Sequence, residues 1–208
     1  MLKLLVVGDS GVGKTSLINR YVYQTCPFSE YSSTTKMEKY IKFETHFNDH
    51  RFPNAIAQID LEIYDTPSEI PSLLPDFDAV ILISDFRPES IDRLSCHWTP
   101  LLDKLMSPKQ SRFLIANKTD LVNPQFSGQV KEYCCKRKIF MSTCSAKNNI
   151  GVYDAFQKII SQIVQDNEHQ LKIKYTPKRN LNDHVDVIDI LGTLIYLPII
   201  ILYRIRRG

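Results

Sequence analysis

An eight-residue loop near the start of the chain constrains its fold more than any other feature. The apolar run Leu2–Val7 leads into Gly8–Thr15, whose sequence Gly-Asp-Ser-Gly-Val-Gly-Lys-Thr matches the phosphate-loop pattern G-x-x-x-x-G-K-[ST] at every fixed position. Apolar residues then recur at helical spacing from Leu17 to Val22. A strand, a glycine-rich loop and a helix in this order direct backbone N–H groups and the helix dipole at phosphate oxygens. The octet therefore predicts a nucleoside triphosphate site.

The members of this loop have separate expected roles. Lys14 should reach the β and γ phosphates, and the hydroxyl of Thr15 should bind Mg²⁺. The glycines allow the backbone to fold into a concave shape whose N–H groups face the phosphates. The candidate nucleotide-binding residues here are Ser10, Gly11, Val12, Gly13, Lys14, Thr15 and Ser16.

Strand-like and helix-like segments alternate through the first 168 residues, which predicts an α/β fold. The expected strands are Leu2–Val7, Tyr40–Phe47, Ile56–Tyr64, Ala79–Ser84, Phe113–Ala116 and Ile139–Met141. The expected helices run from Lys14 to about Gln24, from Pro88 to about Met106, from Pro124 to Lys138 and from Val152 to about Glu168. The polar turn at residues 48–51 suits a hairpin between the second and third strands. We therefore expect a P-loop NTPase domain with a six-stranded mixed sheet flanked by helices.

Further motifs follow three of the predicted strands. Asp65 comes directly after the third strand, where a phosphate-loop protein needs a carboxylate near Mg²⁺. The Asn-Lys-Thr-Asp sequence at 117–120 fits the N-K-x-D signature of guanine-binding proteins, because the Asp120 carboxylate can accept from the ring N–H and the amino group of guanine. In the Ser-Ala-Lys sequence at 145–147, the Ala146 N–H would meet the guanine oxygen. The candidate residues added by these motifs are Asp65, Asn117, Lys118, Asp120, Ser145, Ala146 and Lys147.

Together these motifs resemble the Ras superfamily of small GTPases, most closely its Rab branch, over residues 1–168. The resemblance implies a G domain that binds GTP and GDP with Mg²⁺ and contacts protein effectors and regulators through two switch loops. It also implies a threonine in the first switch that binds Mg²⁺ and senses the γ-phosphate. We assign this role to Thr34, with Thr35 as the second choice. The expected Mg²⁺ ligands are then Thr15, Thr34 and Asp65.

The second switch departs from the family pattern. Residues 65–69 read Asp-Thr-Pro-Ser-Glu where the family has D-T-A-G-Q, so Glu69 replaces the glutamine that orients the attacking water. A carboxylate adds negative charge beside an anionic transition state, and Pro67 restricts a segment that has to move. We expect a protein that switches between GTP and GDP states in membrane traffic or signalling, with Glu69 and Thr34 as catalytic residues and with weak or altered GTP hydrolysis. The alternative is a guanine nucleotide-binding scaffold that hydrolyses little and is anchored at a membrane.

The C-terminal part of the chain has a different composition. Residues 169–184 read as a basic polar linker, and residues 185–208 as a membrane-associating tail with an apolar stretch at 190–203. No cysteine follows Cys144, which argues against prenylation. The apolar stretch would form about 21 Å of helix against a hydrocarbon core of about 30 Å, which favours a hydrophobic tail helix lying at the bilayer interface. A helix packed on the domain and a spanning tail anchor are the alternatives.

Composition also indicates where in the cell the protein acts and what it binds. Five cysteines without a C-x-x-C spacing, and an N-terminus without a charged and apolar leader, favour a cytoplasmic protein that is membrane-associated through its tail. Besides guanine nucleotide, we expect protein effectors and regulators at the switch loops and lipid at the tail as partners, and no nucleic acid. Trp98, the only tryptophan, is expected to pack in the core.

Overall fold

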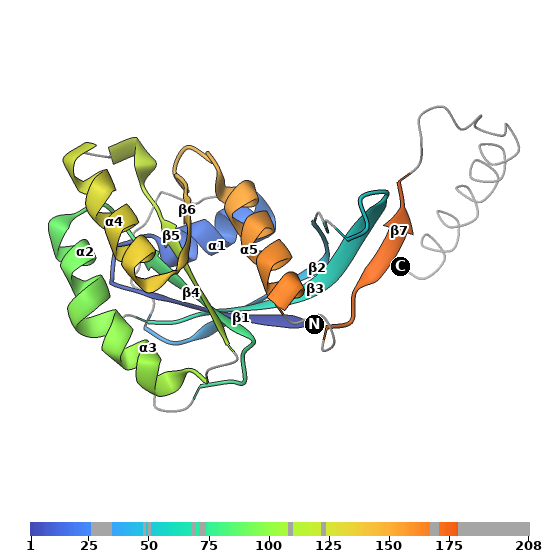
Figure 1. The fold of residues 1–208 in the computed structure, drawn as a ribbon, viewed down its shortest axis with the longest axis horizontal. Coiled ribbons are helices and arrows are strands. Elements are labelled where there is room, and N and C mark those ends of the chain that lie inside the picture. The colour runs from blue at the N-terminus through green and yellow to red at the C-terminus, as the bar shows by residue number, and fades with distance from the viewer. Residues whose placement is uncertain are drawn as a thin grey trace, which may run out of the picture. The chain divides into compact units, whose positions relative to one another are not determined.

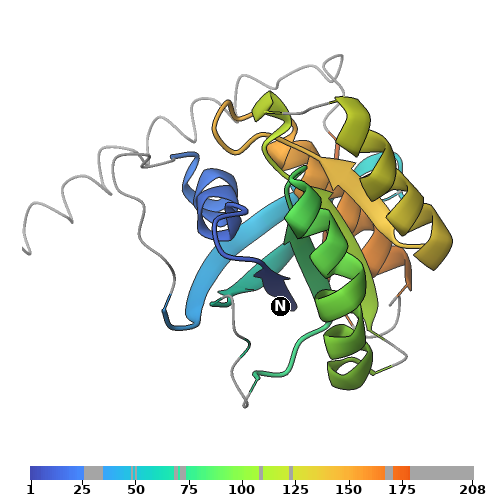
Figure 2. The same ribbon diagram turned by 90° about the vertical axis from the view of Figure 1, so that its left-hand side faces the viewer.

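The computed structural model describes residues 1–25, 35–47, 49, 51–67, 70, 74–107, 110–121, 124–166 and 171–178. Within these residues a mixed β-sheet is flanked by helices, as Figures 1 and 2 show. The expected α/β fold is therefore confirmed. The chain from Met1 to Thr176 forms one compact unit, and only Pro177 and Lys178 are described of the unit that follows.

The six predicted strands and four predicted helical segments occur close to their expected positions. The strands are β1 (Leu2–Gly8), β2 (Glu38–Phe47), β3 (Ala55–Asp65), β4 (Ala79–Ser84), β5 (Ser111–Ala116), β6 (Phe140–Thr143) and β7 (Lys174–Pro177). The helices are α1 (Lys14–Tyr23), α2 (Pro88–Arg93), the π-helical turn η1 (Leu94–Trp98), α3 (Thr99–Leu105), the 3₁₀ turn η2 (Thr119–Leu121), α4 (Pro124–Arg137) and α5 (Val152–Asp166).

The main path of the sheet has the order β2-β3-β1-β4-β5-β6. Strands β3, β1, β4, β5 and β6 run parallel, while β2 is antiparallel to β3, so the expected hairpin is confirmed. Since parallel strands point their carboxyl ends the same way, the loops that follow β1, β3, β5 and β6 open at one edge of the sheet. This edge carries the predicted motifs.

Strand β1 lies inside the sheet, and its two faces pack in two different cores. Leu4 and Val6 pack with α1 and α5, whereas Leu5 and Val7 pack with α2, η1, α3 and α4. All four side chains are fully buried, as alternating side chains of a strand covered on both faces should be. The phosphate loop thus begins from a strand fixed on both sides.

The segment predicted as one helix from Pro88 to Met106 is helical but contains a π-helical turn at Leu94–Trp98. The backbone N–H of Thr99 bonds to the carbonyl oxygen of Leu94, five residues earlier. Pro100 supplies the physical reason, because a proline ring inside an α-helix collides with the carbonyl group four residues before it. The extra residue in the turn relieves that collision.

Strand β7 is the main departure from the sequence prediction. Lys174–Pro177 fall within the expected linker 169–184, yet they pair with β3, so the described sheet has seven strands where six were expected. Strand β1 pairs only with residues Leu61–Asp65, the second half of β3. Along the first half of β3, the edge that faces β1 further on has no partner from β1. The boundaries assigned to the G domain, the linker and the tail stay predictions.

A polar cluster attaches β7 to the β2–β3 hairpin. The hydroxyl of Tyr175 donates to Oδ2 of Asp49 at 2.7 Å, and Nη2 of Arg51 donates to the same carboxylate at 2.6 Å. The rings of Phe52 and Tyr175 lie 4.6 Å apart between centroids. The hydrogen bonds from Arg51 and Tyr175 hold the pKa of Asp49 well below its ordinary value. A segment far along the chain is thereby fixed to the hairpin.

No helix in the described ranges is both long and apolar enough to cross a membrane. The apolar stretch 190–203 lies outside the described residues, so the predicted tail helix and its lipid contacts stay predictions.

Replacing Tyr175 by phenylalanine should loosen β7. The variant keeps the ring contact with Phe52 and loses the hydrogen bond to Asp49, which should lower the free energy of unfolding by about 1 kcal/mol. Urea unfolding measures this difference, and amide hydrogen exchange in β7 should become faster. The control Tyr153→Phe removes a hydroxyl from an exposed tyrosine of α5. Equal stability of wild type and Tyr175→Phe would contradict the proposed attachment.

Candidate nucleotide-binding site

Two glycines give the phosphate loop its shape. Gly8 has a φ of 148°, and a Cβ atom there would lie 2.2 Å from the carbonyl oxygen of Ile83. Gly13 has a φ of 93°, and its Cβ atom would lie 2.5 Å from Nδ2 of Asn117. Both positions therefore exclude any larger residue, for lack of space and because of their backbone conformation. The fixed glycines of the pattern are explained by these contacts.

The helix that follows the loop is suited to an anion. In the described part of the chain, no side chain caps the N-terminus of α1, and its first turn holds no acidic residue. The positive end of the helix dipole therefore faces the loop without a competing negative side chain from that turn.

Lys14 lies across the inside of the loop. Its Nζ atom donates to the carbonyl oxygens of Gly8 at 2.8 Å and Asp9 at 3.1 Å. The side chain is buried, and this burial lowers the pKa of Lys14, while the carboxylates of Asp65 and Asp9 oppose the shift. Phosphate oxygens close to the ammonium group would offset the cost of its burial. The position fits the predicted role.

The residues proposed to bind Mg²⁺ meet at the end of β3. Oγ1 of Thr15 donates to Oδ2 of Asp65 at 2.5 Å, and the Asp65 side chain is fully buried. A hydroxyl and a carboxylate oxygen are the hard ligands that Mg²⁺ prefers, so this pair fits the ion. Thr34, the third predicted ligand, lies outside the described residues.

Asn117 joins the phosphate loop to the two loops predicted to bind the base, residues 117–120 and 145–147. Its Nδ2 donates to the carbonyl oxygen of Val12 at 2.9 Å, and its Oδ1 accepts from the backbone N–H of Ala146 at 3.0 Å. The side chain is 1% exposed. The Ala146 N–H, which was expected to meet the guanine oxygen, thus contacts Asn117 in this structure. The role predicted for it toward the base stays a prediction.

The carboxylate expected to select guanine is also oriented by a neighbouring loop. Oγ of Ser145 donates to Oδ1 of Asp120 at 2.6 Å, and this hydrogen bond orients the carboxylate. Lys118 has a φ of 64°, and its Nζ contacts Oδ2 of Asp85 at 3.1 Å. The side chain of Lys147 is exposed. The structure therefore brings the phosphate loop, residues 117–120 and residues 145–147 together.

Three supporting residues were missed from the sequence. Asp85, directly after β4, holds Lys118 and accepts from Nε of Arg87 at 2.8 Å. Arg20 of α1 donates to the carbonyl oxygen of Ala146 at 3.1 Å and so holds the last base loop. Asp9 accepts from side chains beyond the loop. Only Asp85 carried a usable signal, since it follows a strand at the edge where Asp65 and the Asn117 loop lie.

The proposed catalytic apparatus lies mostly outside the described residues, which include neither Thr34, Ser68 nor Glu69. The start of the second switch is described: Thr66 donates through its hydroxyl and its backbone N–H to the carbonyl oxygen of Val6, at 2.8 and 3.2 Å. Pro67 follows this fixed point.

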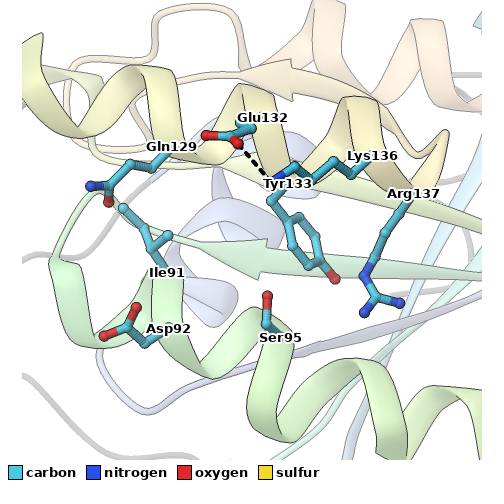
Figure 3. A pocket seen from close by; sticks show the side chains of 8 residues that line it. All are labelled: Ile91, Asp92, Ser95, Gln129, Glu132, Tyr133, Lys136 and Arg137. Atoms are coloured by element: carbon cyan, nitrogen blue, oxygen red, sulfur yellow. Dashed lines mark ion pairs between the residues drawn. The ribbon is translucent and has the colours of Figure 1, made fainter.

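A separate hollow of about 570 Å³ lies between α2, η1 and α4 (Figure 3). Its lining residues are Ile91, Asp92, Ser95, Gln129, Glu132, Tyr133, Lys136 and Arg137. Glu132 and Lys136 form an ion pair of 2.6 Å. None of the predicted nucleotide-binding residues lines this hollow, so it is distinct from the phosphate loop.

The fold and the three joined loops define a phosphate-loop protein of the guanine nucleotide-binding class. Residues 3–165 match the sequence model of the Ras family. The chain is 31% identical to the Ras-related protein Rab-7b of Mus musculus over 197 residues, which cover 88% of the chain and 90% of the relative. It is 30% identical to the Ras-related protein Rab7 of Cenchrus ciliaris over 203 residues, which cover 90% of the chain and 91% of the relative. The chain therefore belongs to the Ras family, as a Rab-like small GTPase.

Replacing Asp120 by alanine should remove guanine binding without creating a site for adenine. Loss of two hydrogen bonds to a charged acceptor, each worth about 1.5–3 kcal/mol, should weaken GDP binding at least about a hundredfold. Titration of wild type and variant with fluorescent GDP and ATP analogues measures both affinities. Asp103→Ala, which removes an exposed carboxylate of α3, is the control. Undiminished GDP binding, or a gain in ATP binding, would contradict the assignment.

Proposed function

We propose that this protein binds GTP and GDP with Mg²⁺ and acts as a nucleotide-dependent switch in membrane traffic. The observation that carries the proposal is the buried Asn117 side chain, which connects Val12 of the phosphate loop with Ala146 of the last base loop. Family membership supports it, because Ras-family proteins bind guanine nucleotides and respond to the bound state.

Different residues of the site would bind different parts of the nucleotide. Lys14, with the backbone of Ser10–Gly13, would hold the phosphates, and Asp120 would accept from the guanine ring. Thr15 and Asp65 would hold Mg²⁺ together with Thr34. When bound, Mg²⁺ neutralises negative charge between the β and γ phosphates. Ser145 keeps Asp120 oriented, and the short contact between Thr15 and Asp65 keeps both oxygens at one place.

Hydrolysis is proposed to be weak. The phosphate-binding residues match the family pattern, but Glu69 stands at the position of the water-orienting glutamine. A carboxylate cannot both donate and accept as an amide does, and its charge opposes the charge that develops in the transition state. Pro67 fixes φ at the start of a segment that has to rearrange.

A second candidate function is a membrane-anchored scaffold that binds guanine nucleotide and does not turn it over. The sequence Pro67-Ser68-Glu69 favours it, since every change from the family pattern there opposes hydrolysis. The two candidates share the same binding site and differ in the lifetime of bound GTP.

Single-turnover hydrolysis separates the candidates. We expect wild type to hydrolyse GTP more slowly than about 4 × 10⁻⁴ s⁻¹, the intrinsic rate of Ras, and Glu69→Gln to be at least about tenfold faster. Glu132→Gln, an exposed carboxylate of α4, is the matched control. A wild-type rate equal to that of Ras would exclude the scaffold, whereas no detectable turnover in either protein would exclude the switch.

We also propose that the tail associates with membrane without prenylation. Residues 190–203 are apolar and the last residues include Arg204, Arg206 and Arg207, a pattern that favours insertion beside anionic lipid. Effectors and regulators are proposed to bind at the switch loops, as the family relationship suggests.

Flotation with liposomes tests the tail. We expect the full chain to float with vesicles that contain anionic lipid, and a chain truncated after Asn182 to remain in the soluble fraction. Measured GDP binding in both proteins controls for folding of the G domain. If neither protein floats, or if both do, the tail is not the membrane-binding element.

A further inference from the structure

Asp9, the second residue of the phosphate loop, is held by two side chains from distant helical segments. Its Oδ1 atom accepts from Nε of Arg93 at 2.6 Å and from Nε1 of Trp98 at 2.9 Å. The Asp9 side chain is 12% exposed and Trp98 is 1% exposed. The expected packing of Trp98 in the core is therefore confirmed, but its indole N–H also makes a polar contact with the phosphate loop.

The π-helical turn brings these two donors to one face. Arg93 ends α2, and Trp98 ends the turn five residues later. In an α-helix, residues five apart are about 140° apart around the axis. A π-helical turn forms its hydrogen bonds between residues five apart, as an α-helix does between residues four apart, so Arg93 and Trp98 lie closer to one face than they would in an α-helix. Both can then reach the same carboxylate oxygen.

Contacts from α4 hold the π-helical turn in place. The carbonyl oxygen of Leu94 accepts from Oγ1 of Thr99 at 2.6 Å and from the hydroxyl of Tyr133 at 3.3 Å. The hydroxyls of Thr99 and Tyr133 lie 2.7 Å apart. All three residues are buried. The turn is thus a fixed element of the core, on which Arg93 and Trp98 are presented.

The anchoring of Asp9 also affects Lys14, the lysine expected to contact the phosphates. The backbone carbonyl of Asp9 accepts from Nζ of Lys14 at 3.1 Å, so the same residue is anchored by its side chain and contacts the ammonium group by its backbone. The Arg93 guanidinium also compensates the charge of Asp9, which would otherwise repel an anion in the loop.

We propose that Asp9, Arg93 and Trp98 are positioning residues, which fix the phosphate loop in its binding conformation and thereby slow the release of guanine nucleotide. This inference rests on the proposed nucleotide binding. It also assigns a function to the π-helical turn. The turn places Arg93 and Trp98 where both can hold Asp9, and this contact sets how firmly the phosphate loop holds its ligand.

A mutant cycle tests the coupling. Dissociation of a fluorescent GDP analogue is measured for Arg93→Gln and Trp98→Phe, each alone and combined with Asp9→Ala. We expect each change to speed release about tenfold in the wild-type background and less than about twofold when Asp9→Ala is already present. Lys136→Gln, which removes an exposed cation of α4, is the control and should release the analogue at the wild-type rate.

A second readout reports the contact itself. Trp98 is the only tryptophan, so one indole N–H resonance appears in the NMR spectrum. We expect Asp9→Ala to shift that resonance even without nucleotide, with the melting temperature recorded for every variant to separate positioning from loss of stability. The inference would be overturned if Arg93→Gln and Trp98→Phe speed release by the same factor with and without Asp9→Ala. An indole resonance that does not shift in Asp9→Ala would also overturn it. A wild-type protein that binds no guanine nucleotide would overturn the proposed function as well.

Discussion

The buried side chain of Asn117 is the interaction on which the nucleotide site depends. It fills the space beside Gly13, donates to Val12 and accepts from Ala146, so that loops from three different strands share one amide group. Leaving a buried donor or acceptor unsatisfied costs about 1–3 kcal/mol per group. The three loops are therefore stable together and unstable apart, which explains how segments that are polar and irregular can form a defined site.

The residues proposed to bind the nucleotide and those proposed to act in hydrolysis lie in different parts of the chain. The phosphate loop begins from β1, a strand that is buried on both faces and whose alternate side chains pack in two cores. The departures from the family pattern lie at Pro67, Ser68 and Glu69, just beyond the point where Thr66 is fixed to Val6. These positions are the basis of the proposal that the protein binds guanine nucleotide and hydrolyses it weakly.

Carboxylates with several donors connect parts of the chain that are distant in sequence. Asp9 links the phosphate loop to the π-helical turn, and Asp49 links the β2–β3 hairpin to Tyr175 of β7. Asp85 holds Lys118 in the base loop. In each case a half-buried or buried negative charge is compensated by directed donors, and hydrogen bonds to a charged group are stronger than those between neutral groups. These contacts fix the loops more firmly than surface ion pairs would.

The sequence by itself determined the α/β fold, the strand and helix positions and the three loops of the site, because glycine spacing, strand-like runs and the Asn117 and Ser145 motifs are local patterns. The tertiary structure decided what those patterns cannot encode. It paired β7 with β3, since a short polar strand carries little signal without its partner edge. It also brought Trp98 to Asp9, because that contact depends on how a helix interrupted before Pro100 packs on a distant loop.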